Sequence, residues 1–386
     1  MNKLNKFFLL ILISLSVSSK NIEANPDIEA QTAILMDHHS SEILYELNPD
    51  VHIYPASMTK IMTSIIAFDL LKNNKISFDD KIVVSETAWH MSQSGYSSMF
   101  IMPNDQVSVE DLLKGIIIVS GNDACVALAE GIAGTEENFV DMMNEKAQEI
   151  GMLDTNFANS SGITNPENYS TVRDIALMSK YLIEQYPEYY PMYSEKEFTW
   201  DRTGGEPISQ FNRNRLLYKN IGADGVKTGY LDAEKYSLAS SIKKGTRRLI
   251  AVGSGFSSKS KRTSQSIKLL SWGFRNTDTF QVSKKGDTFF DIKTWLGTKE
   301  TIKGITKEDL YVTLKKKDVR NFRVILEYDG PIKAPIKKGQ KIANLKILNK
   351  EDVLKTIPIF SSEDIKKINF FKSVFTSLNY MIWGDV

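Results

Sequence analysis

Three short polar segments of this chain carry residue types that could together perform acyl transfer. The first is Ser57-Met58-Thr59-Lys60, the second is Ser120-Gly121-Asn122 and the third is Lys227-Thr228-Gly229. Residues three apart share one face of a helix, so the Lys60 amine can reach the Ser57 hydroxyl. The combination predicts a serine nucleophile that is activated by a lysine rather than by a histidine.

Lys60 can accept the hydroxyl proton only while its amine is neutral. Because the ordinary pKa of lysine is about 10.4, burial and a nearby cation must lower it. Lys227 is the expected cation. The N-terminus of a helix that begins at Ser57 would place a positive dipole end beside the developing alkoxide.

The two downstream segments supply the remaining groups that the reaction needs. Ser120 can relay a proton to the leaving amine, and Asn122 can hold Lys60 and a substrate carbonyl. Lys227 and Thr228 can bind a carboxylate, while Gly229 lets a ligand backbone come close to the strand.

The residue that follows the third segment, Tyr230, would contribute its backbone N–H. Together with the Ser57 N–H it would form an oxyanion hole, which is usually the largest single source of catalysis in acyl transfer.

Each segment taken alone has a structural alternative. The Ser-x-x-Lys pattern recurs at Ser240/Lys243 and at Ser258/Lys261. Asn122 could simply cap the helix after an inter-helix loop, and Lys227 could end a charged strand. The order of the segments, and the apolar stretches beside them, favour a shared site.

Metal-based and histidine-based catalysis find less support. None of the four histidines forms a metal-binding His-Glu-x-x-His pair, and no Gly-x-Ser-x-Gly segment is present. We therefore expect neither a metal nor a cofactor. The histidines are His38, His39, His52 and His90.

Composition places the chain among ordinary globular proteins. It has 386 residues, of which 42% are hydrophobic and 25% charged, enough for two domains. The net charge of +1 argues against nucleic acid as a partner. The single cysteine, Cys125, excludes an intrachain disulfide.

The first 24 residues have the layout of a secretory signal peptide. Lys3 and Lys6 precede an apolar run over residues 7–17, and small and polar residues follow as far as Ala24. A retained membrane anchor is the alternative. Either reading places the rest of the chain outside the cytoplasm.

Hydrophobic periodicity predicts a mixed helix and strand domain over residues 25–276. A hairpin is expected from residues 31–37 and 42–46, and strands at 226–229, 236–242 and 248–253. Helices are expected at residues 58–71, 112–119, 123–132, 135–150, 169–182 and 264–274.

The sequence pattern changes after residue 276. Short β-rich runs at residues 311–314, 323–328, 342–348 and 353–360 predict a small all-β domain over 277–360. Residues 365–383 place apolar side chains on one helical stripe with lysines beside it. We expect residues 361–386 to form an amphipathic helix that lies on a membrane surface, although docking on the protein itself is the alternative.

Longer matches extend these segments into a resemblance that covers nearly the whole chain from about Gln31. The matching stretches are 55–63, 98–100, 120–126, 169–170 with 173–174, 212–214 with 216–217, 224–229, 248–250 and 272–274. The chain resembles the D-alanyl-D-alanine carboxypeptidases, the low-molecular-mass penicillin-binding proteins, whose signature joins the same three segments.

The resemblance implies a transpeptidase-like α+β domain, with an antiparallel sheet flanked by helices, followed by a β domain and a helix on the outer face of the cytoplasmic membrane. It implies a serine acyl-enzyme that removes the terminal D-alanine from the peptidoglycan pentapeptide stem and is acylated by β-lactams. By resemblance Ser57 is the nucleophile, Lys60 the general base, Ser120 the proton relay and Asn122 the substrate clamp.

By the same resemblance, Lys227 and Thr228, together with Arg248 on a neighbouring strand, hold the terminal carboxylate. The chain departs from the usual pattern after Gly229. Leu231 stands where the family has threonine, and Glu234-Lys235 stand where it has Ala-Gly. Three alternatives remain: a D,D-endopeptidase, a serine β-lactamase, and a non-catalytic peptidoglycan-binding protein.

Overall fold

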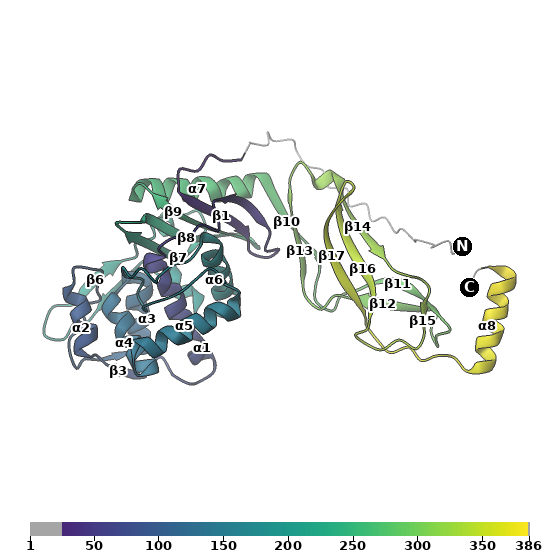
Figure 1. The fold of residues 1–386 in the computed structure, drawn as a ribbon, viewed down its shortest axis with the longest axis horizontal. Coiled ribbons are helices and arrows are strands. Elements are labelled where there is room, and N and C mark those ends of the chain that lie inside the picture. The colour runs from purple at the N-terminus through teal and green to yellow at the C-terminus, as the bar shows by residue number, and fades with distance from the viewer. Residues whose placement is uncertain (1–24, 385–386) are drawn as a thin grey trace. The chain divides into compact units, whose positions relative to one another are not determined.

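The computed structural model describes residues 25–384, so the expected signal peptide lies outside the described residues. The chain divides into two compact units between Arg275 and Asn276. Figure 1 shows a mixed helix and sheet unit and a β-rich unit that ends in a helix. The fold class predicted from the sequence is confirmed.

The centre of the first unit is an antiparallel sheet of five strands in the order β2-β1-β9-β8-β7. The expected hairpin forms from the first two strands, and β1 pairs along its other edge with β9. The strands are β1 (Thr32–Asp37), β2 (Ile43–Leu47), β7 (Ala223–Leu231), β8 (Lys235–Lys244) and β9 (Arg247–Phe256).

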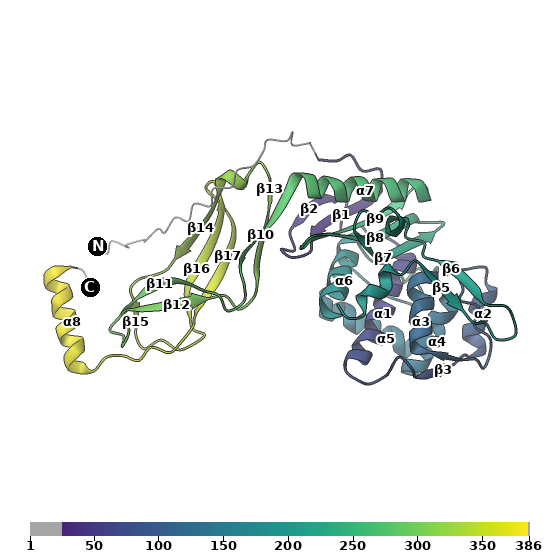
Figure 2. The same ribbon diagram turned by 180° about the vertical axis from the view of Figure 1, so that it is seen from behind.

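Alternating side chains bury both faces of this sheet. Ile34 and Val252 face the large core that the N-terminal helices cover, whereas Leu35 and Ala251 face α7 (Lys259–Asn276). Figure 2 shows α7 lying along one side of the sheet and the other helices on the opposite side. Period-two alternation therefore explains why the unit has three layers.

Most helices of the large core follow the sequence predictions, whereas α2 (Glu86–Gln93) was not predicted. The other helices are α1 (Lys60–Lys72), α3 (Val109–Lys114), α4 (Asn122–Ala133), α5 (Glu136–Ile150) and α6 (Val172–Gln185). Thr135 caps α5 by accepting from the Asn138 N–H, and Gly151 ends the helix in the left-handed conformation. Two small hairpins, β3 (Lys81–Val83) with β4 (Gln106–Ser108) and β5 (Glu197–Trp200) with β6 (Ile208–Phe211), lie outside the main sheet.

The starts of α6 and α7 differ clearly from the prediction. α7 begins at Lys259, five residues before the expected start at residue 264. A helix was also expected from Tyr169, but α6 begins at Val172 with Thr171 as its cap. Tyr169 and Ser170 instead form isolated β-bridges to Asn156 and Ile53. The backbone of Ser170 thereby holds the segment that leads towards Ser57.

The second unit is a β domain with more strands than were predicted. Six strands form a sheet in the order β14-β16-β17-β12-β11-β15, and β10 pairs with β13. The strands are β10 (Thr277–Ser283), β11 (Thr288–Trp295), β12 (Thr301–Ile305), β13 (Leu310–Lys315), β14 (Phe322–Glu327), β15 (Ile332–Lys333), β16 (Lys341–Asn349) and β17 (Asp352–Ser361).

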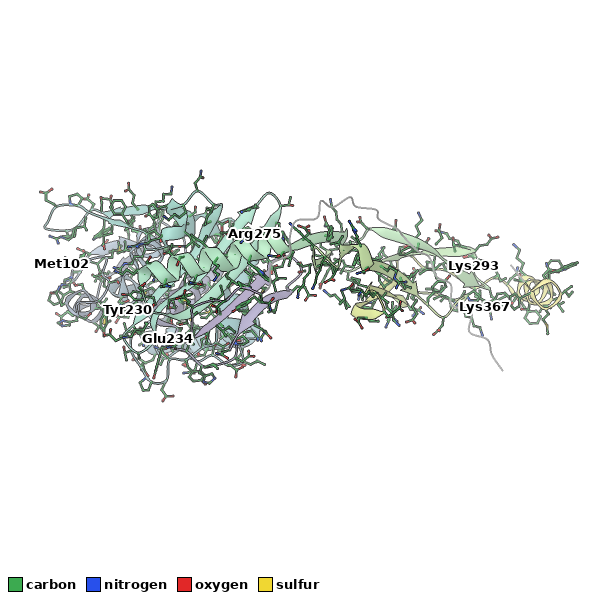
Figure 3. The ribbon with its side chains drawn as sticks, turned by 90° about the horizontal axis from the view of Figure 1, so that it is seen from above. Met102, Tyr230, Glu234, Arg275, Lys293 and Lys367 are labelled. Carbon is green, nitrogen blue, oxygen red and sulfur yellow. The ribbon has the colours of Figure 1, made fainter. Side chains whose placement is uncertain are left out.

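The C-terminal helix is shorter than predicted. α8 spans Phe370–Trp383 and is capped by Asn369, whereas the preceding residues belong to the β domain. Ile365 is 1% exposed and pairs with Ile336, so it is part of the β core and not of a helical stripe. Figure 3 shows Lys367, just before α8, at the end of the β unit that also carries Lys293.

No side chain of α8 is buried, and Phe371, Phe375, Met381 and Ile382 are among its most exposed. Its described contact with the β domain is the edge-to-face pair of Tyr380 and Trp295. Within residues 25–384, no helix has the length and apolar character that crossing a membrane requires.

Candidate active site

The nucleophile candidate lies on a short helical turn that joins α1. Ser57 belongs to a 3-10 turn, Ala56–Thr59, and α1 begins at Lys60. Ala56 has a φ of 49°, a left-handed conformation that is strained for a residue other than glycine. The turn thus fixes Ser57 at the entrance of a buried helix, with its side chain lining the cleft.

Lys60 is held by three oxygen atoms. Its Nζ lies 3.2 Å from Ser57 Oγ, 2.7 Å from Asn122 Oδ1 and 2.6 Å from the carbonyl oxygen of Ser161. The side chain is buried, with 1% of the residue exposed. The structure therefore brings together Ser57, Lys60 and Asn122, as the motif spacing predicted.

Burial lowers the pKa of Lys60 below its ordinary value, and the positive charge of Arg213 lowers it further. From the sequence, Lys227 was the cation expected to lower the pKa of Lys60. Burial also depresses the pKa of Lys227 strongly, and the charges of Lys60 and Arg213 add to this effect. Neutral amines are thus favoured in the buried part of the site, and a neutral Lys60 can accept a proton.

Ser120 reaches the cleft because the helix before it is distorted. α3 continues into a π-helical turn, Gly115–Val119, and Ser120 follows with a φ of 69°. The sequence predicted a regular helix over residues 112–119. The wider turn and the left-handed residue project the Ser120 side chain into the cleft, as π-bulges often do at functional sites.

Asp123, the residue after this segment, anchors the facing loop. Its carboxylate accepts from the Ser98 hydroxyl at 2.6 Å and from the backbone N–H groups of Met99 and Phe100 at 2.9 and 2.8 Å. The Asn122 N–H also donates to the Ser97 carbonyl. The loop over residues 97–100 and the second polar segment are therefore one hydrogen-bonded body.

Strand β7 forms the opposite wall. Thr228, Gly229 and Tyr230 line the cleft, and an added Cβ at Gly229 would lie 3.1 Å from the Pro55 carbonyl oxygen. This close approach explains the glycine, since a larger residue would push the strand away from the turn that carries Ser57. Lys227 is buried behind this surface, with 3% exposed.

Arg248, expected from the sequence to hold the substrate carboxylate, is paired with a carboxylate of the protein itself. Its guanidinium makes a two-pronged contact with the Asp224 carboxylate, at 2.8 and 2.6 Å, and stacks on Tyr190. Arg248 does not belong to the lining of the cleft. An arginine that is already neutralised by a carboxylate lacks the free charge that a substrate carboxylate needs.

Two other arginines face the cleft, where Arg248 had been expected. Arg213 and Arg262 line the cleft, and no carboxylate among the described residues pairs with either. The Arg262 guanidinium contacts the Gly229 carbonyl at 3.4 Å, and that of Arg213 donates to Ser97 Oγ at 2.5 Å. Arg213 stood in a matched stretch but received no role, and no pattern in the sequence marked Arg262.

The loop over residues 160–162, which is distant in sequence, packs against Lys60 and the turn before it. The carbonyls of Ser160 and Ser161 accept from Thr63 Oγ1 and Lys60 Nζ, at 2.5 and 2.6 Å. Gly162 follows with a φ of 77°, and a Cβ there would collide with the Ala56 carbonyl oxygen. No sequence pattern could mark the role of Ser161, because every residue type has the backbone carbonyl that contacts Lys60.

The residues that depart from the family pattern after Gly229 form a turn with a structural role. Lys235, in the usual place of glycine, adopts a φ of 62°. Glu234 is buried, and its carboxylate accepts from the Tyr54 N–H at 3.2 Å and from Ser254 Oγ at 2.6 Å. Burial raises the pKa of Glu234. Figure 3 shows Glu234 near Tyr230, which comes from the same turn.

Known proteins share this arrangement of sequence and fold. The family model of the D-alanyl-D-alanine carboxypeptidases, peptidase family S11, matches residues 19–257. The model of the C-terminal domain of penicillin-binding protein 5 matches residues 278–367. Both matches follow the division between the two units.

Individual relatives are similar over most of the chain. D-alanyl-D-alanine carboxypeptidase DacC of Escherichia coli is 37% identical over 98% of this chain and 94% of its own length. The crystal structure of penicillin binding protein 5 from Haemophilus influenzae has a TM-score of 0.85 at 38% identity, covering 89% of this chain and all of that one.

A third similar protein has been solved with an antibiotic. The cefotaxime-bound structure of penicillin-binding protein D2 from Listeria monocytogenes has a TM-score of 0.59 at 28% identity, and covers 65% of this chain and all of that one.

Proposed function

The chain belongs to peptidase family S11, the D-alanyl-D-alanine carboxypeptidases, and from that membership we propose that it hydrolyses the terminal D-Ala–D-Ala bond of peptidoglycan pentapeptide stems. The observation that carries the mechanism is the buried contact of Lys60 Nζ with Ser57 Oγ at 3.2 Å. It joins a nucleophile to a base whose amine is driven towards neutrality.

Acylation begins when neutral Lys60 takes the Ser57 hydroxyl proton. The Ser57 oxygen attacks the carbonyl carbon of the penultimate D-alanine, and the negative charge passes to the carbonyl oxygen. The backbone N–H groups of Ser57 and Tyr230 are the proposed donors to that oxygen. Asn122, which already accepts from Lys60, keeps the base aimed at the serine.

Collapse of this intermediate breaks the C–N bond and leaves an ester on Ser57. The departing D-alanine nitrogen needs a proton, and Ser120, whose side chain lines the same cleft, is the proposed relay from protonated Lys60. Water then attacks the ester while Lys60 accepts a proton from it. The bond between the acyl carbon and the Ser57 oxygen breaks, that oxygen takes the proton from Lys60, and the shortened stem leaves. The net reaction consumes one water and releases one D-alanine.

The substrate carboxylate is assigned to the opposite wall. Thr228 offers a hydroxyl, and Arg213 and Arg262 supply positive charge that no described carboxylate neutralises. Lys227 lies buried behind them and sustains a positive potential at this wall whenever it is protonated. A β-lactam carries a carboxylate at the corresponding end, so it would acylate Ser57 by the same route.

Release of D-alanine from diacetyl-Lys-D-Ala-D-Ala tests the assignment. The wild-type protein should release free D-alanine and retain a fluorescent penicillin covalently, and Ser57→Ala should do neither. Ser258→Ala is the matched control, because Ser258 begins another Ser-x-x-Lys pattern yet only caps a helix through the Lys261 N–H. Full labelling of Ser57→Ala would refute the nucleophile, and a lack of D-alanine release by the wild type would refute the activity.

We also propose that the chain works on the outer face of the cytoplasmic membrane. Residues 1–24 would direct export, and α8 would lie on the lipid surface through its exposed apolar side chains. Support comes from Phe371 and Phe375, which are 84% and 68% exposed, an unusual state for phenylalanine in water.

A further inference from the structure

The cleft carries two cations that the proposed reaction does not use. Arg215 begins the 3-10 turn Arg215–Tyr218, and Lys259 begins α7. Both side chains are exposed, and both line the cleft that also holds Ser57. Among residues 25–384, neither makes an ion pair or a side-chain hydrogen bond.

The charges around the cleft are strongly unbalanced. Arg213, Arg215, Lys259 and Arg262 line it, whereas Asp232 is the one acidic residue in the lining among the described residues. Asp232 is itself engaged as the acceptor of the Tyr230 hydroxyl at 2.6 Å. Several other arginines of the protein pair with carboxylates.

Arg173 and Arg248 are two examples of such ion pairs. Arg173 contacts Asp50 and Glu46, and Arg248 contacts Asp224. Leaving four cations together without such partners costs electrostatic free energy through mutual repulsion. A ligand with negative charge would offset that cost, so the imbalance indicates what the cleft accepts.

Arg215 lies close enough to Arg262 to act on it electrostatically. Burial, and after it the positive charge of Arg215, lowers the pKa of Arg262 to about 10. Arg262 itself contacts the carbonyls of Gly229 and Arg213 at 3.4 and 3.5 Å. The positive surface therefore continues from the wall beside β7 out to Arg215 at the rim.

A single terminal carboxylate does not neutralise this surface. One carboxylate has two oxygens and a charge of −1, which Arg213, Arg262 and the Thr228 hydroxyl satisfy in the proposed function. The exposed pair of Arg215 and Lys259 then remains without a counter-charge. It lies within the same cleft, where more of the substrate must pass.

We propose that Arg215 and Lys259 form a second anion subsite, which binds a second free carboxylate of the stem peptide. This inference rests on the proposed function and names its substrate class: stems whose acidic residues are not amidated. Such a carboxylate has two chemical sources. One is the α-carboxylate of a γ-linked glutamate at position two of the stem, and the other is the side-chain carboxylate of a diamino dicarboxylic acid at position three.

Four synthetic pentapeptides separate these sources. All end in D-Ala-D-Ala, and position three is either lysine or diaminopimelate, while position two is either a γ-linked glutamate with a free carboxylate or its amide. Affinities are measured by calorimetry on the Ser57→Ala protein, which binds without turnover, and kcat/KM is measured on the protein with Ser57.

The peptide with both free carboxylates should bind about fivefold more tightly than the lysine peptide with the amide, since exposed ion pairs contribute modestly. The advantage should shrink between 20 and 300 mM salt, because salt screens exposed charges. Whichever single carboxylate retains most of the advantage identifies the source.

Variants then locate the subsite. Arg215→Gln with Lys259→Gln should bring the ratio of the two affinities close to one. Lys219→Gln with Lys261→Gln is the matched control, since Lys219 follows the same 3-10 turn and Lys261 lies in α7. Both are absent from the cleft lining, Lys219 is exposed, and the partly exposed Lys261 pairs with Glu29. The control should keep the wild-type ratio.

Two results would overturn the subsite: equal affinities for all four peptides at low salt, or a ratio that survives the double substitution at Arg215 and Lys259. Failure of the proposed function looks different. In that case the protein with Ser57 releases no D-alanine from any peptide, although the affinities of the Ser57→Ala protein still decide whether the subsite exists.

Discussion

Lys60 donates to the carbonyl oxygen of Ser161 at 2.6 Å, a contact between residues 101 positions apart that orients the amine towards Ser57. A buried ammonium needs acceptors for its protons, and this carbonyl and the Asn122 side chain provide two. When Lys60 is neutral, its lone pair is left to the serine. The two fixed oxygens thus determine which direction the base faces.

Replacing Lys60 with arginine should abolish acylation. Arginine keeps a positive charge at every accessible pH, so it cannot accept the serine proton, and general bases commonly contribute roughly 10²–10⁴-fold. The measurement is the second-order rate constant for fluorescent penicillin. A Lys60→Arg protein that acylates within a few-fold of wild type would show that another group is the base.

The pH dependence of acylation should follow the same group. Burial depresses the pKa of Lys60, and only its neutral form accepts a proton. Activity should therefore rise with pH through this lowered pKa and reach a plateau below the ordinary value of about 10.4. An ascending limb centred near the ordinary lysine value would contradict a buried, depressed base.

Alanine at position 162 should damage the site, whereas alanine at position 151 should not. Both glycines have a positive φ, so either substitution costs about 1–3 kcal/mol of strain. Only Gly162 is also packed against the Ala56 carbonyl, while no atom lies within 4 Å of a Cβ at Gly151. We expect Gly162→Ala to slow acylation roughly 100-fold by displacing Ser57. Similar acylation rates for the two variants would argue against this tight packing.

Substitutions of Arg248 and Arg262 should distinguish a structural role from a role in substrate binding. Arg248→Gln removes the partner of Asp224 and should lower the free energy of unfolding by about 1–3 kcal/mol, with little change in KM. Arg262→Gln should raise KM about tenfold through the lost charge–carboxylate contact. Urea unfolding and steady-state kinetics check the pair. The reverse pattern would restore the carboxylate role to Arg248.

Removal of α8 should release the protein from lipid without unfolding it. Purified protein that starts at Asn25 and stops after Asn369 should not sediment with vesicles of phosphatidylethanolamine and phosphatidylglycerol, while its melting temperature stays the same because α8 buries no side chain. In the longer protein, Phe371→Asp with Phe375→Asp should act like the truncation. Ser373→Asp with Ser377→Asp adds the same charge off the apolar stripe and should retain more binding. Undiminished sedimentation of the truncated protein would refute the role of α8.

Local sequence patterns predicted much of the fold and about half of the site. The spacing of Ser57 and Lys60 predicted their contact because a helical turn repeats on that scale, and the strand-like runs at residues 31–37 and 248–253 predicted β1 and β9. Ser161 and Gly162 could not be foreseen, since their roles depend on backbone atoms brought in from a distant loop.

Arg248 and Ile365 show a second limit. An arginine in a strand does not reveal whether a carboxylate will neutralise it, and here Asp224 of β7 does so because β7 and β9 flank β8 in one sheet. Ile365 fits a helical period by chance, but the β domain gains more by burying it against Ile336. Tertiary contacts decided both positions.

The place of β1 at the interior of the first sheet governs how this unit is made. Thr32 to Asp37 pair with Leu249 to Ser254, so the first strand lacks one neighbour until more than two hundred later residues are available. Loop closure over that distance is slow. During synthesis the central sheet therefore cannot be completed before β9 emerges, so the N-terminal hairpin waits for the C-terminal part of the same unit.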